Sequence, residues 1–217
     1  MTTNFYFRHG KRWLDVVGAV VGLVVLSPLL LVIGVAVRVT SRGPVLFRQS
    51  RVGLGGTPFV ILKFRSMTQG AEKMGPGITR EKDPRITKIG VFLRKWKLDE
   101  LPQLVNVLRG DMSIVGPRPE LAQYVQHYTA QQRQVLSVRP GITDLASLRY
   151  RSEEALLQAS NDPGRLYLEK IMPDKLTLNL QYIESLSFIG DLTLIVLTLK
   201  SLVIRSTSGT NYGCLPV

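Results

Sequence analysis

The sequence predicts a predominantly helical α+β protein with a small β-hairpin, held on a membrane by its N-terminal segment. Three observations predict this class. Residues 16–37 form an uncharged apolar run of 22 residues, and about 20 such residues can cross a bilayer as a helix. Residues 45–64 contain two β-prone stretches around a glycine-rich turn, which is typical of a hairpin. Most of the remaining chain has helical periodicity and helix-capping residues.

The composition indicates a folded, basic protein with a polyanionic partner. The 217 residues include 28 Lys and Arg against 16 Asp and Glu, a formal net charge of +12, and 45% of them are hydrophobic. That apolar share excludes intrinsic disorder, and the single Cys214 excludes a disulfide scaffold. One cysteine and two histidines are too few for a zinc site of the usual kind. Nucleic acid, an anionic membrane face and a phosphorylated substrate remain as partner classes.

The centre of the apolar run contains Ser27-Pro28, and basic residues flank the run on both sides. Proline kinks a helix and frees a carbonyl, for which the Ser27 hydroxyl is a candidate partner. Lys and Arg favour the cytoplasmic side of a membrane. Because both ends of the run are equally basic, we expect a monotopic protein with a re-entrant helix-break-helix that enters and leaves by one face. A proline-kinked transmembrane helix is the alternative.

The hairpin follows the apolar run. Its strands are expected at Val45–Arg48 and Phe59–Phe64, with the turn at Gly53–Pro58. Alternation along the second strand places Lys63 and Arg65 on one face. That face either contacts solvent or faces an anion.

Helices and one short strand are expected after the hairpin. Asp99 suits the N-cap of a helix that ends at Gly110. The segment MSIVGPRPE, residues 112–120, predicts a short strand and a rigid Pro-Arg-Pro turn. Further helices are expected at 86–97, 121–138, 153–160, 176–186 and 191–205, the last suited to a core or an interfacial position.

Two features of this part could carry chemistry. Asp99-Glu100 closely follows three basic residues. An ionised carboxylate there could attack phosphorus or bind Mg²⁺, although an acidic pair at a helix start is most often a cap. Arg118 lies between Pro117 and Pro119, which fix its backbone, and its planar guanidinium suits phosphate or a nucleobase edge. An exposed surface turn is the alternative reading for Arg118.

Several motifs, in this order, resemble the bacterial sugar transferase family: KRWLD, the Ser-Pro break, GPVLFRQSRVG, FVILKFRSM, LDELPQLVNVLRGDMSIVGPRP and RPGIT. The similarity covers Lys11–Thr143 and continues weakly to the C-terminus. These proteins are monotopic polyprenol-phosphate phosphoglycosyl transferases, and the chain resembles the small type that consists of the catalytic module alone.

The resemblance implies an enzyme on the cytoplasmic face of the bacterial inner membrane. It would move a phosphosugar from a UDP-sugar to undecaprenyl phosphate and release UMP, with Mg²⁺ as cofactor. This reaction is the first membrane step of capsule, O-antigen, exopolysaccharide or glycoprotein glycan assembly. The implied organisation is a membrane-embedded re-entrant helix at 1–40, a cytoplasmic catalytic domain with amphipathic interfacial helices at 41–205, and a flexible tail at 206–217.

The resemblance also implies roles for single residues. Asp99 is the expected nucleophile, which forms a covalent phosphosugar intermediate in a ping-pong cycle. Glu100 is its partner. Both carboxylates are expected to bind the metal, and a role in proton transfer is the alternative for Glu100. Ser27 and Pro28 match the break of the re-entrant helix. The residues expected to contact phosphate or nucleotide are Lys63, Arg94, Pro117, Arg118 and Pro119.

One position departs from the family pattern, because Asp144 stands where many members have glycine after PGIT. This carboxylate is expected near the sugar or nucleotide, and the sequence leaves the identity of the sugar open. The other expected partners are anionic inner-leaflet lipids and a second copy in a homodimer. Nucleic acid is not expected, since the sequence has no helix-turn-helix, zinc or RNP signature. A basic membrane-anchored scaffold or a nucleic-acid-binding protein without catalysis are the alternatives.

Overall fold

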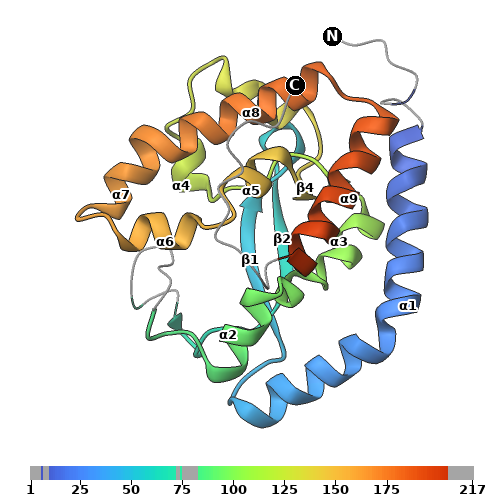
Figure 1. Cartoon of the computed structure of the whole chain (residues 1–217), viewed down its shortest axis with the longest axis vertical. Helices are drawn as coiled ribbons and strands as arrows, with labels where there is room; N and C mark the ends of the chain where they lie inside the picture. Colours follow the sequence, from blue (N-terminus) through green and yellow to red (C-terminus); the bar gives the residue numbers. More distant parts are fainter. Residues whose placement is uncertain (1–5, 7–9, 72–73, 75–82, 205–217) are drawn as a thin grey trace.

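The structure, a computed structural model, describes residue 6, residues 10–71, residue 74 and residues 83–204. The expected tail at 206–217 lies outside the described residues, as do residues 72–73 and 75–82 between the hairpin and the next helix. Helices dominate the described part, around a central hairpin (Figure 1). The helices are α1 (Lys11–Thr40), α2 (Lys88–Lys95), α3 (Gln103–Arg109), α4 (Ala122–Val125), α5 (Leu145–Arg149), α6 (Glu153–Gln158), α7 (Pro163–Leu166), α8 (Met172–Glu184) and α9 (Phe188–Ile204), with short 3-10 helices η2 (Leu54–Gly56), η4 (Leu98–Glu100) and η5 (Gln132–Ser137) and the π-helix η6 (Tyr167–Ile171).

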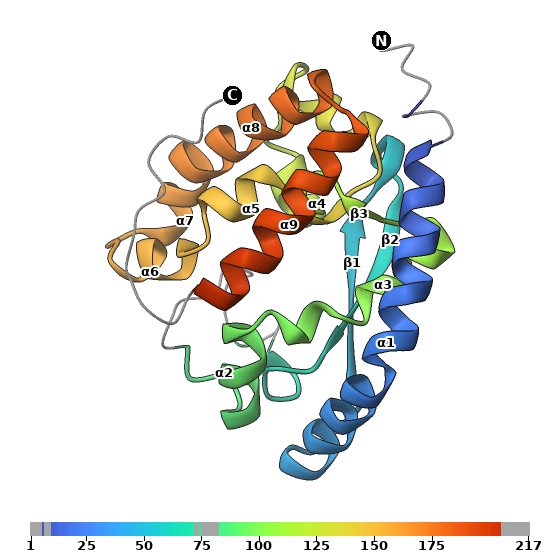
Figure 2. The same ribbon diagram turned by 45° about the vertical axis from the view of Figure 1, so that its right-hand side comes forward.

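The hairpin is confirmed, with a longer first strand than expected. Strands β1 (Leu46–Val52) and β2 (Pro58–Phe64) pair antiparallel, from Leu46 opposite Phe64 to Val52 opposite Pro58. Figures 1 and 2 show the hairpin between α1 on one side and α5 to α8 on the other. The hairpin therefore lies between the long N-terminal helix and these four helices.

A second, parallel pair of strands contains one element that the sequence analysis missed. Strand β3 (Ser113–Val115) was expected, but its partner β4 (Gly141–Thr143) starts where a turn was expected. A side-chain carbon at Gly141 would lie 2.1 Å from the backbone nitrogen of Gly116. Only glycine allows this approach, so Gly141 permits the pairing that fixes the start of the Pro-Arg-Pro turn.

The single helix expected over 121–138 is wrong, because the structure has two short helices there, α4 and η5. Thr129 and Gln132 form a reciprocal cap: the Thr129 amide donates to Gln132 Oε1 at 2.9 Å, and the Gln132 amide donates to Thr129 Oγ1 at 3.2 Å. This Thr-x-x-Gln pattern is a helix start signal. It begins a new helix inside the predicted one, and it was readable in the sequence.

The expectation that Asp99 caps a long helix is also wrong. Lys97 has a left-handed backbone with φ +56°, which ends the turn after α2 and places Asp99 inside the short helix η4. The following α-helix, α3, begins only at Gln103. Its predicted end at Gly110 is confirmed, since Gly110 is the left-handed C-cap with φ +89°.

Helix α1 continues through Pro28 and bends in its middle (Figures 1 and 2). Proline at position 28 cannot donate to the carbonyl of Val24, and the Ser27 hydroxyl donates to that oxygen at 2.8 Å instead. The predicted role of Ser27 toward the carbonyl freed by Pro28 is therefore confirmed. By length and composition α1 is apolar enough to cross a membrane, and only 11% of its most apolar window is buried in the protein.

Both halves of α1 pack against the same body. In the first half, Ala19 lies in a cluster with Val107 and Met112. In the second half, Ile33 and Val37 cluster with residues that include Phe64 of β2. Residues on both sides of the bend thus pack against the rest of the fold.

Buried polar contacts fix both ends of α1. At the start, Lys11 pairs with Asp191 of α9 at 2.6 Å, and Asp15 accepts hydrogen bonds from the side chain of Ser113 and the amide of Ile114, both at 2.9 Å.

At the other end, Arg65 donates to the backbone oxygen of Ser41 at 2.7 Å and to that of Pro44. Arg65 therefore neither faces solvent nor remains available to an anion; it closes the C-terminal end of α1.

Candidate active site

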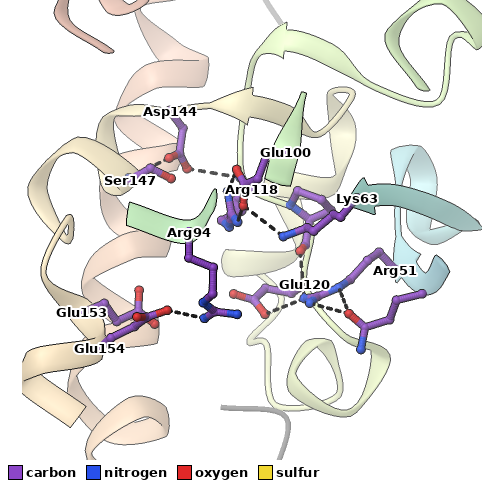
Figure 3. Close-up of polar contacts among 12 residues, drawn as sticks. Arg51, Lys63, Arg94, Glu100, Arg118, Glu120, Asp144, Ser147, Glu153 and Glu154 are labelled. Atoms are coloured by element: carbon purple, nitrogen blue, oxygen red, sulfur yellow. Dashed lines mark hydrogen bonds and ion pairs between the residues drawn. The ribbon is translucent and has the colours of Figure 1, made fainter. Parts of the chain in front are cut away.

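Three charged side chains from distant parts of the sequence meet beside the hairpin. Lys63 Nζ donates to Glu100 Oε1 at 3.0 Å, and Arg118 Nη1 donates to Glu100 Oε2 at 3.1 Å. Arg118 Nη2 also donates to Glu100 Oε1. We call these three residues the Glu100 cluster (Figure 3).

Each member of the Glu100 cluster has a local reason for its place. Lys63 lies near the end of β2, whose pairing with β1 fixes its direction. Glu100 lies in η4, which the left-handed Lys97 turns toward the strand. Arg118 follows β3 and lies in the proline-flanked turn. The tertiary structure therefore brings Lys63, Glu100 and Arg118 together.

The Glu100 carboxylate is ionised in this environment. The residue is 7% exposed, and burial by itself would raise its pKa. The positive charges of Arg118 and Lys63 outweigh burial and hold the pKa of Glu100 well below its ordinary value. In return, Glu100 raises the pKa of Arg118, so this pair stays charged throughout the physiological pH range.

Asp99 has the opposite environment to its neighbour. It is 6% exposed, and its Oδ1 has no hydrogen-bond partner among the described residues. Burial and the adjacent negative charge of Glu100 raise the pKa of Asp99, against the opposing effect of Lys63. A buried, unpaired carboxylate oxygen costs free energy, and Asp99 is the carboxylate of the adjacent pair that has this oxygen free for a ligand.

Lys63 is the basic residue of the cluster whose charge is easiest to change. Burial lowers its pKa to about 8, although the neighbouring Glu100 acts in the other direction. The side chain is therefore close to its protonation midpoint in mildly alkaline solution. A buried lysine of this kind can neutralise an anion and also respond to pH.

Arg94 is not part of the Glu100 cluster in this structure. It lies in the last turn of α2 and pairs with Glu154 of α6. Figure 3 shows the side chain of Arg94 beside the cluster, directed toward Glu154. The expected phosphate-binding arginine therefore already has a carboxylate partner.

Asp144 supports the Pro-Arg-Pro turn rather than presenting a free carboxylate. Its Oδ1 accepts the amide of Ser147 at 2.6 Å and caps α5, and its Oδ2 accepts the amide of Arg118 at 3.2 Å. Asp144 is 1% exposed. Asp144 is expected near the sugar or nucleotide; in the structure its carboxylate holds the backbone of Arg118 and Ser147.

The flanking prolines act through their carbonyl groups. Pro117 O accepts the amide of Gly141 at 2.9 Å, and Pro119 O accepts Nη1 of Arg51 at 3.2 Å. Arg51 was missed in the sequence analysis, although it lies in the GPVLFRQSRVG segment that the resemblance contains. Its pairing with β2 fixes the direction of β1, and the bond from the Val52 amide to the Glu120 carbonyl oxygen at 3.0 Å brings the end of β1 to the turn.

The residues at this site fit a magnesium ion with limited protein ligation. Among the described residues, no group of three or more His, Cys, Asp and Glu side chains could hold a metal ion. Mg²⁺ is usually held by one or two carboxylates together with substrate phosphates. The unpaired oxygen of Asp99 could supply one carboxylate ligand, whereas both oxygens of Glu100 are engaged by Arg118 and Lys63.

Similarity to known proteins identifies the family of this chain. The family model described as bacterial sugar transferase matches residues 6–205. The chain is 40% identical, over 89% of its length, to a UDP-glucose:undecaprenyl-phosphate glucose-1-phosphate transferase of Caulobacter vibrioides, of which it covers 69%. A transferase of the same name from Xanthomonas campestris pv. campestris is 42% identical over 89% of this chain.

A third relative has a different sugar in its name. It is the UDP-N-acetylgalactosamine-undecaprenyl-phosphate N-acetylgalactosaminephosphotransferase of Aeromonas hydrophila, 35% identical over 89% of this chain. The chain spans 43% of the Aeromonas protein and 38% of the Xanthomonas protein. The match of the family model over nearly the whole chain, and that to the Caulobacter protein, lead to one conclusion: the chain belongs to the bacterial sugar transferase family.

Proposed function

We propose that this protein transfers a phosphosugar from a UDP-sugar to undecaprenyl phosphate and releases UMP, through a covalent intermediate on Asp99. The observation that carries the proposal is the unpaired, buried oxygen of Asp99 beside the cationic Lys63 and Arg118. The names of the relatives support the two substrates, since each combines a UDP-sugar or its sugar phosphate with undecaprenyl phosphate.

The chemical sequence has two displacements at the same phosphorus atom. In the first, a carboxylate oxygen of Asp99 attacks the phosphorus that carries the sugar. The bond from that phosphorus to the bridging oxygen breaks, and UMP leaves with the electron pair. In the second, an oxygen of undecaprenyl phosphate attacks the same phosphorus, which forms the lipid diphosphosugar and returns the Asp99 carboxylate.

The cations of the site counter the repulsion between an anionic nucleophile and an anionic substrate. Lys63 and Arg118 neutralise Glu100 in the resting site, and we propose that a substrate diphosphate competes for these two cations. Arg94 would join them by leaving Glu154. Mg²⁺, held by Asp99 with substrate phosphates, would neutralise phosphate charge when bound.

We also propose that the protein is monotopic on the cytoplasmic face of the inner membrane, with α1 re-entrant. Supporting this, both halves of α1 pack on one body, and the exposed faces between them are apolar: Val24 and Val25 are each 68% exposed. A helix that crossed the bilayer would separate its two ends by about 30 Å of hydrocarbon. Helix α9 also exposes apolar residues, Ile189 and Leu199 among them, which suits an interfacial position.

The test of catalysis is a mass measurement on the full-length protein in lipid nanodiscs. Incubation with UDP-sugar and Mg²⁺, without the lipid acceptor, should add the mass of a phosphosugar to the peptide that contains Asp99. If neither an adduct nor UMP appears without the acceptor, and UMP is released once undecaprenyl phosphate is added, the result would instead support direct attack by the lipid phosphate. If UMP release persists at the normal rate in Asp99→Asn, the nucleophile assignment is wrong. No reaction with any member of a UDP-sugar panel would favour the scaffold alternative.

Topology is tested separately, in a Cys214→Ser background. Cysteines introduced at Gly10 and Arg42 should react with a membrane-impermeant reagent from the same side. Labelling from opposite sides would show that α1 spans the membrane. The homodimer stays a prediction, which the mass of the nanodisc complex tests.

A further inference from the structure

Beyond the residues already assigned, one half-buried arginine contacts the backbone of the Pro-Arg-Pro turn. Arg51 lies in β1, and its Nη1 donates to the carbonyl oxygen of Pro119 at 3.2 Å. Its side chain is mostly buried, and Nη1 lies 3.9 Å from the carboxylate of Glu120. Arg51 therefore contacts the two residues that directly follow Arg118.

A second residue of the same strand fixes the orientation of Arg51. Gln49 Oε1 accepts both Nε of Arg51 at 3.2 Å and Nη2 at 2.8 Å. These bonds engage one edge of the planar guanidinium and leave Nη1 directed at the Pro119 carbonyl oxygen. Figure 3 shows Arg51 directed toward Glu120, the residue that follows Pro119. The geometry thus forms a chain from Gln49 through Arg51 to the turn.

The turn is held from two opposite sides. On one side Asp144 accepts the amide of Arg118 at 3.2 Å, and on the other Arg51 donates to the carbonyl of Pro119. The amide of Val52 also donates to the carbonyl oxygen of Glu120 at 3.0 Å, which ties the end of β1 to the same segment. Between these contacts, the Arg118 side chain extends to Glu100.

The surroundings of Arg51 also partly offset the effect of burial on its charge and restrict the position of its guanidinium. Burial lowers the pKa of Arg51, and the neighbouring Glu120 acts against this change. Glu120 is itself contacted by the hydroxyl of Tyr167 and lies 4.0 Å from Lys175 Nζ. A network of this kind restricts the guanidinium to one position, whereas an exposed arginine would sample many.

From these contacts we infer that Arg51, oriented by Gln49, is a positioning residue that holds the Pro-Arg-Pro turn so that Arg118 reaches the substrate phosphates. The inference rests on the proposed function of Arg118. It assigns Arg51 no contact with substrate. Its effect on the reaction passes through the turn, because a small displacement of a phosphate-binding group slows transfer strongly.

The experiment compares four variants in nanodiscs: Arg51→Gln, Gln49→Ala, their double mutant, and Arg48→Gln as a matched control on the exposed side of the same strand. We measure kcat/KM for the UDP-sugar from UMP release, and the thermal midpoint of unfolding. Arg51→Gln should lower kcat/KM by about 10-fold or more, while Arg48→Gln leaves it unchanged.

The double mutant separates positioning from general damage. If Gln49 acts through Arg51, the loss caused by Gln49→Ala should disappear in the Arg51→Gln background. Losses that simply multiply, or an Arg51→Gln enzyme as active as Arg48→Gln, would overturn the inference. Should Arg51→Gln fail to fold, Arg51→Lys takes its place, since it keeps the charge and lacks the planar fork. Full activity in Arg51→Lys and Gln49→Ala would then refute positioning.

Failure of the proposed function has a different signature. In that case the parent protein itself releases no UMP from any UDP-sugar, and the variants cannot differ in activity. An active parent with unaffected Arg51 and Gln49 variants would reject the positioning role alone.

Discussion

Helix α1 and the Glu100 cluster both reverse the usual distribution of side chains, in opposite directions. The centre of α1 exposes valines, whereas the cluster buries Glu100 and half-buries Lys63 and Arg118. A long apolar surface is unfavourable in contact with water, and a charge buried without a partner costs free energy. Each region is therefore stable only in a particular environment. For α1 that environment is lipid, and for the cluster it is a set of opposite charges that balance one another.

Asp99 has a buried carboxylate oxygen without a hydrogen-bond partner among the described residues. We expect its substitution to have the largest effect. Asp99→Asn should reduce UMP release by more than about 10³-fold. Its thermal midpoint should be equal or higher, because burial raises the pKa of Asp99 and the ionised form therefore costs stability above the ordinary pKa of an aspartate. UMP release and thermal unfolding measure the two effects, with exposed Glu169→Gln as control. A variant that loses stability and activity together would point to a structural role.

Glu100→Gln should break the charge balance itself. Lys63 and Arg118 would lose their shared carboxylate, which we expect to cost about 3 kcal/mol of unfolding free energy as well as activity.

The parent protein should show the matching pH dependence in denaturant unfolding. The pKa of Glu100 is lower in the folded state than in the unfolded state. Its stabilisation is therefore present above the ordinary pKa of a glutamate and is lost as the pH falls through the folded value. Unchanged stability in Glu100→Gln at neutral pH would contradict the balanced-charge interpretation.

Val25→Asp tests the other region. Val25 is 68% exposed, so the fold should tolerate the change. A charge at the centre of a membrane helix costs about 2.5–3.5 kcal/mol on insertion scales, and we expect weaker retention of the protein in liposome flotation. Val25→Leu is the matched control. Equal flotation of both variants would show that this face of α1 does not contact lipid.

Lys63 should give the cluster a measurable pH response. Burial lowers its pKa to about 8, against the effect of Glu100. We expect kcat/KM for the UDP-sugar to fall as the pH rises through about 8, because the site then loses a positive charge. Lys63→Arg, which stays charged, should move this fall to higher pH, whereas exposed Lys170→Arg should not. An identical profile for Lys63→Arg would remove Lys63 from the phosphate-binding set.

The smallest expected effect concerns the ion pair at the edge of the site. Glu154→Gln frees Arg94 from its carboxylate partner. Because partly exposed pairs contribute up to about 1 kcal/mol, KM for the UDP-sugar should fall by no more than about 5-fold. Steady-state kinetics measures this change, with Glu169→Gln as control. A higher KM would mean that Glu154 assists binding.

The sequence by itself determined the local features of this protein. The apolar run, the Ser27-Pro28 break, the hairpin and the C-cap at Gly110 follow from residue chemistry within a few positions. The same holds for Thr129 with Gln132, a local signal that was present and missed. The resemblance of several motifs indicated the family, and it distinguished Asp99 and Glu100 from the other carboxylates of the chain.

Only the tertiary structure decided how those residues differ. Asp99 and Glu100 are neighbours in sequence, yet Glu100 is neutralised by Lys63 and Arg118 while an oxygen of Asp99 stays unpaired. The tertiary structure also brings Arg51 into contact with the Pro-Arg-Pro turn. Contacts between residues this far apart depend on strand pairing and on the left-handed turn at Lys97. Local patterns cannot encode them, because burial and charge pairing are properties of the assembled surroundings of a residue.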